Sequence, residues 1–162
     1  MNAQHPFRLR RMATIGLAVL AFSLAASADD HERAARVPLL PAYAQECSGC
    51  HLAYPPGLLP AASWQRLMAN LPRHFGTDAS LDPALTKSLS AWLVAHAGSG
   101  RRANEAPPED RITRSTWFVR EHDEVGSAVW KRPAVKNPSN CAACHPRAEQ
   151  GAFNEHDIRI PR

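Results

Sequence analysis

Two pentapeptides of one pattern constrain this chain of 162 residues more than any other feature: CSGCH at residues 47–51 and CAACH at residues 141–145. Two cysteines three positions apart on a helical turn can both form thioethers with the vinyl groups of one porphyrin, and the imidazole that follows then comes under the iron. Cys-x-x-Cys-His is the attachment signature of c-type haem. The two copies use all four cysteines of the chain. The sequence therefore predicts two covalently bound haem c groups.

Two other kinds of site also use cysteine pairs, a four-thiolate zinc site and thioredoxin-like dithiols. Neither explains why a histidine follows each pair. A redox dithiol is also typical of a strand-helix-strand context that the sequence lacks. The residues expected to attach the two haems and to bind their irons are then Cys47, Cys50, His51, Cys141, Cys144 and His145.

The first 28 residues have the layout of a secretory signal peptide. Three arginines precede an apolar run at residues 15–26, and Ala26-Ser27-Ala28 supplies an A-x-A cleavage site. A membrane-spanning helix needs about 20 apolar residues, so this run is too short to anchor the chain. We therefore expect a periplasmic protein that acquires haem after export and has no stable membrane insertion once the signal peptide is removed.

Charge argues against a nucleic-acid partner. The chain has 19 Lys and Arg against 15 Asp and Glu, a net charge of +4, and the loss of three arginines with residues 1–28 leaves +1. Four haem propionates would move the mature protein to the acidic side. Nucleic-acid binding requires a strongly basic surface, so no nucleic-acid partner is expected.

Beyond the signal peptide, the sequence predicts two units joined by a linker. Residues 29–98 and residues 111–162 are separated by the polar stretch 99–110. Each unit is too small to bury a large apolar core alone, so haem is expected to supply the missing core. By analogy with small metal-dependent domains, the haem-free chain is expected to be largely unfolded.

In the first unit, residues 29–45 are expected to form an arm that leads to the first haem helix. Apolar residues then recur at helical spacing from Trp64 to Leu71, with Ser63 as the expected N-cap and Pro72 as the stop.

A further helix of the first unit is expected to begin at Asp82, with Pro83 in its first turn, and to be closed by Gly98. Between the first motif and the helices, three prolines in residues 52–60 exclude regular helix or a central strand. This apolar run is expected to cover a haem face.

The sequence of the second unit predicts little regular structure. Ser115 is expected to cap a short helix that places Phe118, His122 and Val125 on one face, whereas two prolines make residues 131–140 irregular. The predicted fold class is mainly α: a cytochrome c-like N-terminal haem domain followed by a small, largely irregular second haem domain.

The remaining axial position of each iron decides the function. Methionine raises the potential of a cytochrome c, but Met68 is the only methionine after the signal peptide, and its place in the apolar stripe beside Leu67 and Leu71 indicates packing. Histidines are the better candidates. His74 lies in a loop before Gly76, where the backbone can approach a flat group closely.

His122 is the second candidate, because its apolar neighbours favour a neutral ring. Proximity along the chain would pair His51 with His74 and His145 with His122, although crossed pairing stays open. His96 and His156 are weaker alternatives. His96 lies near a helix C-terminus, where histidine is favourable without a metal, and His156 lies among polar residues.

Five runs of residues, HLAYPPGLLPAASW, HFGTDASLD, WFVREHDEV, SNCAACH and the ending IRIPR, closely resemble the bacterial periplasmic dihaem cytochromes c usually called DHC. The resemblance implies a class I cytochrome c domain followed by an irregular second haem domain, with two histidines on each iron. It implies His51 and His145 as proximal ligands and His74 and His122 as distal ones. It also implies two redox partners, an oxygen-binding monohaem cytochrome c and a membrane b-type cytochrome.

The expected function is low-potential electron transfer without enzymatic activity, since two histidines on each iron leave no position for a substrate. The alternative is a small dihaem peroxidase or reductase, which requires one open or displaceable position on an iron.

Overall fold

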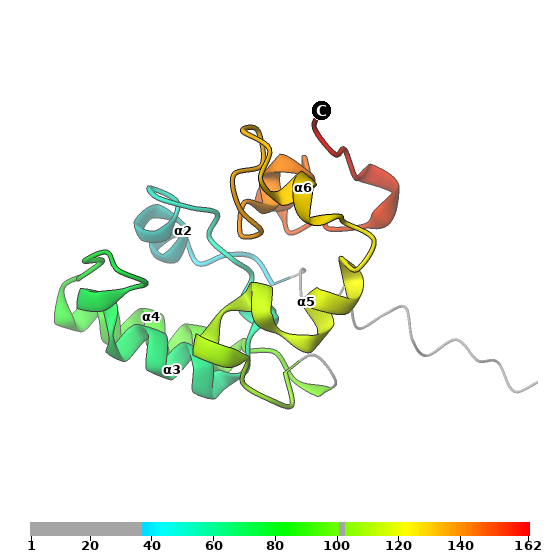
Figure 1. Cartoon of the computed structure of the whole chain (residues 1–162). Helices are drawn as coiled ribbons and strands as arrows, with labels where there is room; N and C mark the ends of the chain where they lie inside the picture. The colour runs from blue at the N-terminus through cyan, green and yellow to red at the C-terminus, as the bar shows by residue number, and fades with distance from the viewer. Residues whose placement is uncertain (1–36, 101–102) are drawn as a thin grey trace, which may run out of the picture.

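The computed structural model describes residues 37–100 and 103–162, so the predicted signal peptide lies outside the described residues. All regular elements of these residues are helices; the described part contains no strand and only two isolated bridges, Pro60 with Gly98 and His74 with Thr77. The mainly α fold class is therefore confirmed (Figure 1). Within the same residues, no helix has the length and apolar character that a membrane span requires.

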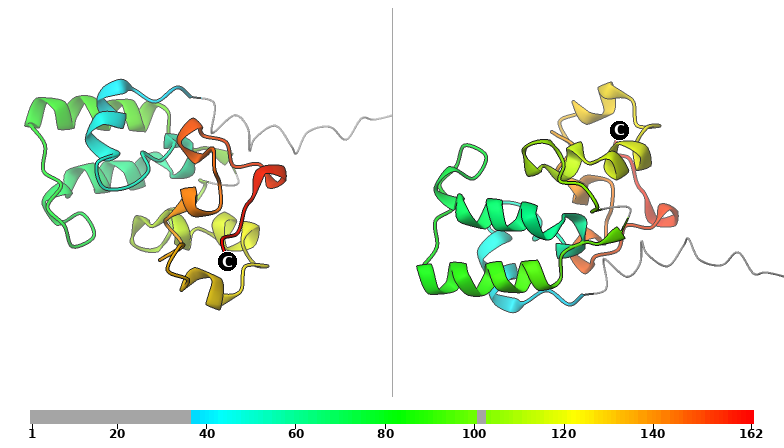
Figure 2. Two further views of the ribbon diagram at one scale, coloured as in Figure 1. Left: turned by 90° about the horizontal axis from the view of Figure 1, so that it is seen from above. Right: turned by 90° about the horizontal axis from the view of Figure 1, so that it is seen from below.

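The described residues of the N-terminal half, 37–98, contain three α-helices: α2 (Pro41–Cys47), α3 (Ala61–Ala69) and α4 (Pro83–Ala95). The two longer helices, α3 and α4, lie side by side, and α2 lies beside them (Figures 1 and 2). The most deeply buried side chains of their shared core are Leu59, Leu89 and Leu93. The expectation of an arm over residues 29–45 is wrong at its C-terminal end, because residues 41–45 belong to α2, which ends at the first cysteine, Cys47.

Helix α4 begins as the sequence predicts. The Asp82 side chain accepts hydrogen bonds from the backbone N–H groups of Ala84 (2.8 Å) and Leu85 (3.1 Å), and Pro83 occupies the first helical position. These bonds satisfy two of the N–H groups that a helix start leaves unpaired. The predicted cap is confirmed.

Helix α3 begins earlier than predicted, and Ser63 is not its cap. Pro60 has extended backbone and is the N-cap, and its carbonyl accepts from the N–H groups of Ser63 (3.0 Å) and Trp64 (3.3 Å). Ser63 therefore lies one turn inside the helix, where it is fully buried. Leu71 and Pro72 fall in a separate 3₁₀-helix, Leu71–Arg73.

Gly98 also has a different role from the one predicted. Helix α4 ends at Ala95 with His96 as the cap, so no glycine is needed there. Gly98 instead lies against the loop before α3, where its N–H donates to Leu59 O at 2.8 Å. A Cβ at this position would collide with Gly57 O and lie 2.8 Å from the Ala103 Cβ. Glycine is required by this close backbone contact.

Gly98→Ala is therefore expected to destabilise the holoprotein by about 1–3 kcal/mol, the usual cost of overpacking. The matched control is Gly126→Ala, because a Cβ at Gly126 meets nothing within 4 Å. Gly126 is the N-cap of the short helix Ser127–Trp130, so its expected cost is below about 1 kcal/mol. Urea unfolding followed by circular dichroism measures both. Equal stability of the two variants would contradict the close contact.

The C-terminal half contains two short α-helices, α5 (Thr116–Glu121) and α6 (Ser127–Trp130), and 3₁₀-helices joined by loops. Ser115 caps α5 as predicted, with its Oγ accepting from Phe118 N–H at 3.2 Å. The C-terminal segment folds back over the second motif, since the N–H of Arg159 donates to Cys144 O at 2.9 Å.

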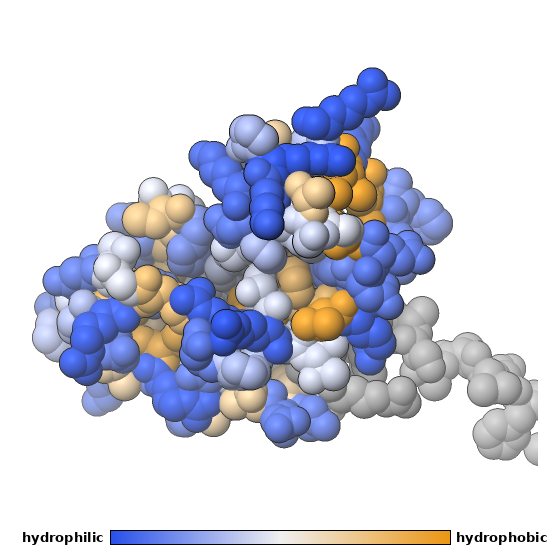
Figure 3. Space-filling view, in the orientation of Figure 1, coloured by the Kyte–Doolittle hydropathy of each residue, from blue (hydrophilic) through white to orange (hydrophobic). Residues whose placement is uncertain are grey.

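The two halves contact each other at several places. Leu58 of the first half packs with Trp117 and Phe118 of the second in one buried cluster. Arg66 on α3 forms two hydrogen bonds with the carboxylate of Asp110, at 2.6 and 2.9 Å. The face shown in Figure 3 is mostly hydrophilic, with apolar side chains in small separate groups.

Candidate haem sites

The first motif begins where α2 ends. Cys47 is the last residue of the helix, and the chain then turns, so that the N–H of His51 points back to Cys47 O at 3.5 Å. The motif thus begins on a helix and finishes in a turn, whereas one continuous helical turn was expected. The ring of His51 is oriented by Nδ1, which lies 2.7 Å from Leu52 O. Such a bond fixes the tautomer and leaves Nε2 for a metal.

His74 faces the first motif from the loop between α3 and α4. The loop reverses through left-handed backbone at Phe75 (φ 50°) and Gly76 (φ 95°), and Thr77 N–H closes it by donating to His74 O at 3.0 Å. This places the ring centre of His74 6.0 Å from that of His51, with 23° between the ring planes. Burial, and then the neighbouring His51, lower the pKa of His74. Both effects favour the neutral ring, which is the form that binds iron.

The second motif forms the 3₁₀-helix Cys141–Ala143, and the chain continues as a turn in which the N–H of His145 donates to Cys141 O at 2.8 Å. His122 caps the end of α5 and its Nδ1 lies 2.9 Å from Phe118 O. The ring centres of His122 and His145 are 6.2 Å apart, with 77° between their planes. Burial, and then His122, lower the pKa of His145, which again favours the neutral ring.

The separations of both pairs fit an iron held between two imidazoles. A metal–nitrogen bond to histidine is about 2 Å long and the ring centre lies about 1 Å behind the nitrogen, so two axial rings should be about 6 Å apart. The measured values are 6.0 and 6.2 Å. The structure thus brings together the two pairs that proximity along the chain suggested, and not the crossed ones.

The cysteines themselves do not suit the two alternative sites. Burial raises the pKa of the Cys47 and Cys141 thiols to about 11 each, whereas redox-active dithiols need a lowered thiol pKa. A zinc site needs its ligands gathered around one point, and over residues 37–100 and 103–162 no three His, Cys, Asp or Glu side chains converge in this way.

The other candidate ligands lie elsewhere. The His96 ring contacts Trp92 on its own helix, and its Nδ1 lies 2.8 Å from Trp92 O. His156 is exposed in the 3₁₀-helix Glu155–Asp157. In the part of the chain that the structure describes, neither ring contacts a motif histidine. Met68 is buried in the core of the first half, which agrees with its predicted packing role.

Aromatic side chains surround the four histidines, and most of them were not expected from the sequence. The ring of Phe118 stacks on His122 with centres 4.0 Å apart, and Trp130 lies 5.9 Å from the same ring. Phe153 lies 5.4 Å from His145. Tyr54 stacks on His51 at 5.0 Å. The sequence offers one signal for these contacts: each of the four aromatic residues lies within eight residues of its histidine.

The chain is similar to a known protein family and to proteins of known structure. Residues 43–153 match the family described as dihaem cytochrome c, DHC. The crystal structure of DHC purified from Rhodobacter sphaeroides is 46% identical, covers 72% of this chain and 99% of its own, and superposes with a TM-score of 0.63.

A second relative of known structure is a diheme cytochrome type c from Shewanella baltica. It is 40% identical, covers 77% of this chain and 95% of its own, and has a TM-score of 0.68. No curated protein is detectably similar in sequence. The family match spans both Cys-x-x-Cys-His motifs and both histidine pairs. The chain therefore belongs to the dihaem cytochrome c family, whose members carry two covalent haem c groups and transfer electrons.

Proposed function

We propose that this protein is a low-potential electron carrier in which His51 and His74 bind the first iron and His145 and His122 bind the second. Cys47 and Cys50 would attach the first haem, and Cys141 and Cys144 the second. When bound, haem supplies a metal that gains and loses one electron. The residues of the chain hold that metal in an unchanging coordination.

The observation that carries the proposal is the pairing of four imidazoles at 6.0 and 6.2 Å. One histidine on each side of a haem would fill the two iron positions that the porphyrin leaves free, so neither iron would keep a position for a substrate. Hydrogen bonds from Nδ1 to backbone carbonyls orient His51 and His122 and make them better ligands. Histidine in place of methionine lowers the potential, which supports the low-potential assignment.

The sequence resemblance supports the location and the partners in this proposal. Residues 1–28 would direct the chain to the periplasm. Residues 29–98 and 111–162 would form the two haem domains, joined by residues 99–110. The electrons would come from a membrane b-type cytochrome and pass to an oxygen-binding monohaem cytochrome c, with no enzymatic reaction at either iron.

Carbon monoxide tests the proposal, because it binds ferrous haem only where an axial position is open. The reduced holoprotein is expected to keep its Soret and visible bands unchanged under carbon monoxide. Rapid binding of one equivalent per protein would instead support the alternative, a small dihaem peroxidase or reductase with one open iron.

A further inference from the structure

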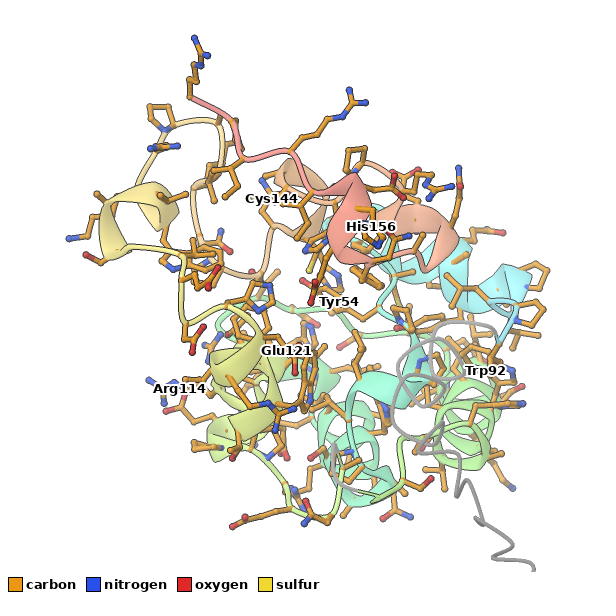
Figure 4. All side chains as sticks on the ribbon, turned by 90° about the vertical axis from the view of Figure 1, so that its right-hand side faces the viewer. Tyr54, Trp92, Arg114, Glu121, Cys144 and His156 are labelled. Atoms are coloured by element: carbon orange, nitrogen blue, oxygen red, sulfur yellow. The ribbon has the colours of Figure 1, made fainter. Side chains whose placement is uncertain are left out.

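The side chain of Tyr54 directly links the surroundings of both motifs. Its ring stacks on His51, with centres 5.0 Å apart and 19° between the planes. Its hydroxyl donates to the backbone carbonyl of Ser139 at 2.8 Å, across 85 residues of sequence. Ser139 precedes Cys141 by two residues, and the Cys141 Sγ lies 3.6 Å from the same carbonyl oxygen. Figure 4 shows Tyr54 near the middle of the molecule, beside the loops that carry Cys144.

The first end of this link is fixed within the first half. The carbonyl of Tyr54 accepts a 2.8 Å hydrogen bond from the hydroxyl of Tyr43, a buried residue of α2. Helix α2 also ends in Cys47. The backbone position of Tyr54 is therefore set by the same helix that carries the first attachment residue.

The second end is fixed within the loop that leads to the second motif. Ser139 N–H donates to Asn137 Oδ1 at 2.9 Å, and Asn140 Nδ2 donates to the carbonyl of Val135 at 3.0 Å. Val135 has no exposed surface. The carbonyl that Tyr54 holds thus belongs to an ordered loop, so a displacement of the phenol would be passed on to Cys141.

Between these ends, Tyr54 packs against both apolar clusters. It contacts the core of the first half and also the cluster of Leu58, Trp117 and Phe118 that joins the halves. We propose that Tyr54 is a positioning residue for both haem sites: its ring orients His51, and its hydroxyl fixes the loop of Cys141. The inference rests on the proposed function, which assigns His51 to the first iron.

The link would matter for electron exchange between the two sites, because the rate of transfer depends on how the fold positions the donor against the acceptor. In that exchange one iron loses an electron and the other iron gains it. No bond forms or breaks, and Tyr54 keeps its proton.

Three variants of the holoprotein separate the two contacts. Tyr54→Phe keeps the ring on His51 and removes only the bond to Ser139. Tyr54→Leu removes both. Tyr43→Phe is the matched control, because it also removes a 2.8 Å bond from a tyrosine hydroxyl to a backbone carbonyl, but within the first half alone.

Proton NMR of the haem methyl groups and a potentiometric titration report on each haem separately. In Tyr54→Phe the methyl signals and midpoint potential of the second haem are expected to move while those of the first stay in place. Tyr54→Leu should move both sets. Tyr43→Phe leaves the bond from Tyr54 to Ser139 in place, so it should move the methyl signals and the midpoint potential of the second haem by less than Tyr54→Phe does.

The inference is overturned if Tyr54→Phe leaves the methyl signals and potential of the second haem unchanged, or if Tyr43→Phe moves them as far as Tyr54→Phe does.

A measurement on the unsubstituted protein does not depend on how the variants fold. The chain has two tyrosines, so ring-labelled tyrosine gives two sets of signals. Those of Tyr54 should respond to the redox state of both haems; a response to the first haem alone would also overturn the inference.

Failure of the proposed function would look different. It would be seen in the unsubstituted protein as a ferric haem that is not low-spin, or as carbon monoxide binding. Two low-spin haems together with an ineffective Tyr54→Phe substitution would overturn only the role of Tyr54.

Discussion

Removal of both haems is expected to unfold most of the chain. The variant for this test carries alanine at the four proposed attachment positions, Cys47, Cys50, Cys141 and Cys144. The buried apolar cluster between the halves has three members, Leu58, Trp117 and Phe118. Helices α5 and α6 have six and four residues, whereas isolated helices shorter than about 12 residues are marginal in water. Without haem between them, the two histidine pairs would also lose the bonds that close their loops.

Far-UV circular dichroism and urea unfolding measure this effect. The four-alanine variant should lose most of its helical signal and show no cooperative transition, while the holoprotein should show one. The unsubstituted chain produced without haem attachment is the control, and it should behave like the variant. A cooperative transition with the helical signal of the holoprotein would show that the polypeptide folds alone.

The features predicted correctly from the sequence depend on neighbouring residues. Asp82 and Ser115 cap their helices because each needs only N–H groups two or three residues ahead. Ser63 and Gly98 were assigned by the same local rules, and there the rules were wrong. Pro60 already supplies an earlier start for α3, and the contact that requires Gly98 comes from Gly57, 41 residues earlier. Such tertiary contacts leave no pattern in the sequence.

The candidate sites also contain some features that neighbouring residues indicate and others that depend on contacts distant in the sequence. Residue type and proximity along the chain suggested that His74 lies near His51 and His122 near His145, with crossed pairing left open, and the structure brings these two pairs of rings together. The sequence suggested neither the stacking of Tyr54 on His51 nor the bond of Tyr54 to Ser139 across 85 residues. The ring planes also differ between the pairs, 23° in one and 77° in the other. The two rings also come from different backbone settings, a loop with left-handed residues for His74 and the end of α5 for His122, and such settings cannot be derived from a spacing.

His122→Ala is expected to convert one of the two haems, half of the total, from low-spin to high-spin iron. The substitution removes the ring that lies 6.2 Å from His145 and keeps Cys141 and Cys144, through which the second haem would be attached. With a single strong axial ligand, the second iron has a weaker ligand field and its potential rises. Electron paramagnetic resonance of the ferric protein and a potentiometric titration measure these changes.

Two further variants make this result specific. His74→Ala should produce the same conversion at the first haem, while the second stays low-spin. His96→Ala is the matched control, because it also removes a ring whose Nδ1 bonds a carbonyl four residues earlier, as His122 does, and it should leave both haems low-spin. The position opened in His122→Ala should also bind carbon monoxide, one equivalent per protein, when the iron is reduced. Low-spin spectra for both haems in His74→Ala and in His122→Ala would show that other residues bind the irons. High-spin iron in His96→Ala would show that His96 binds one of the two irons.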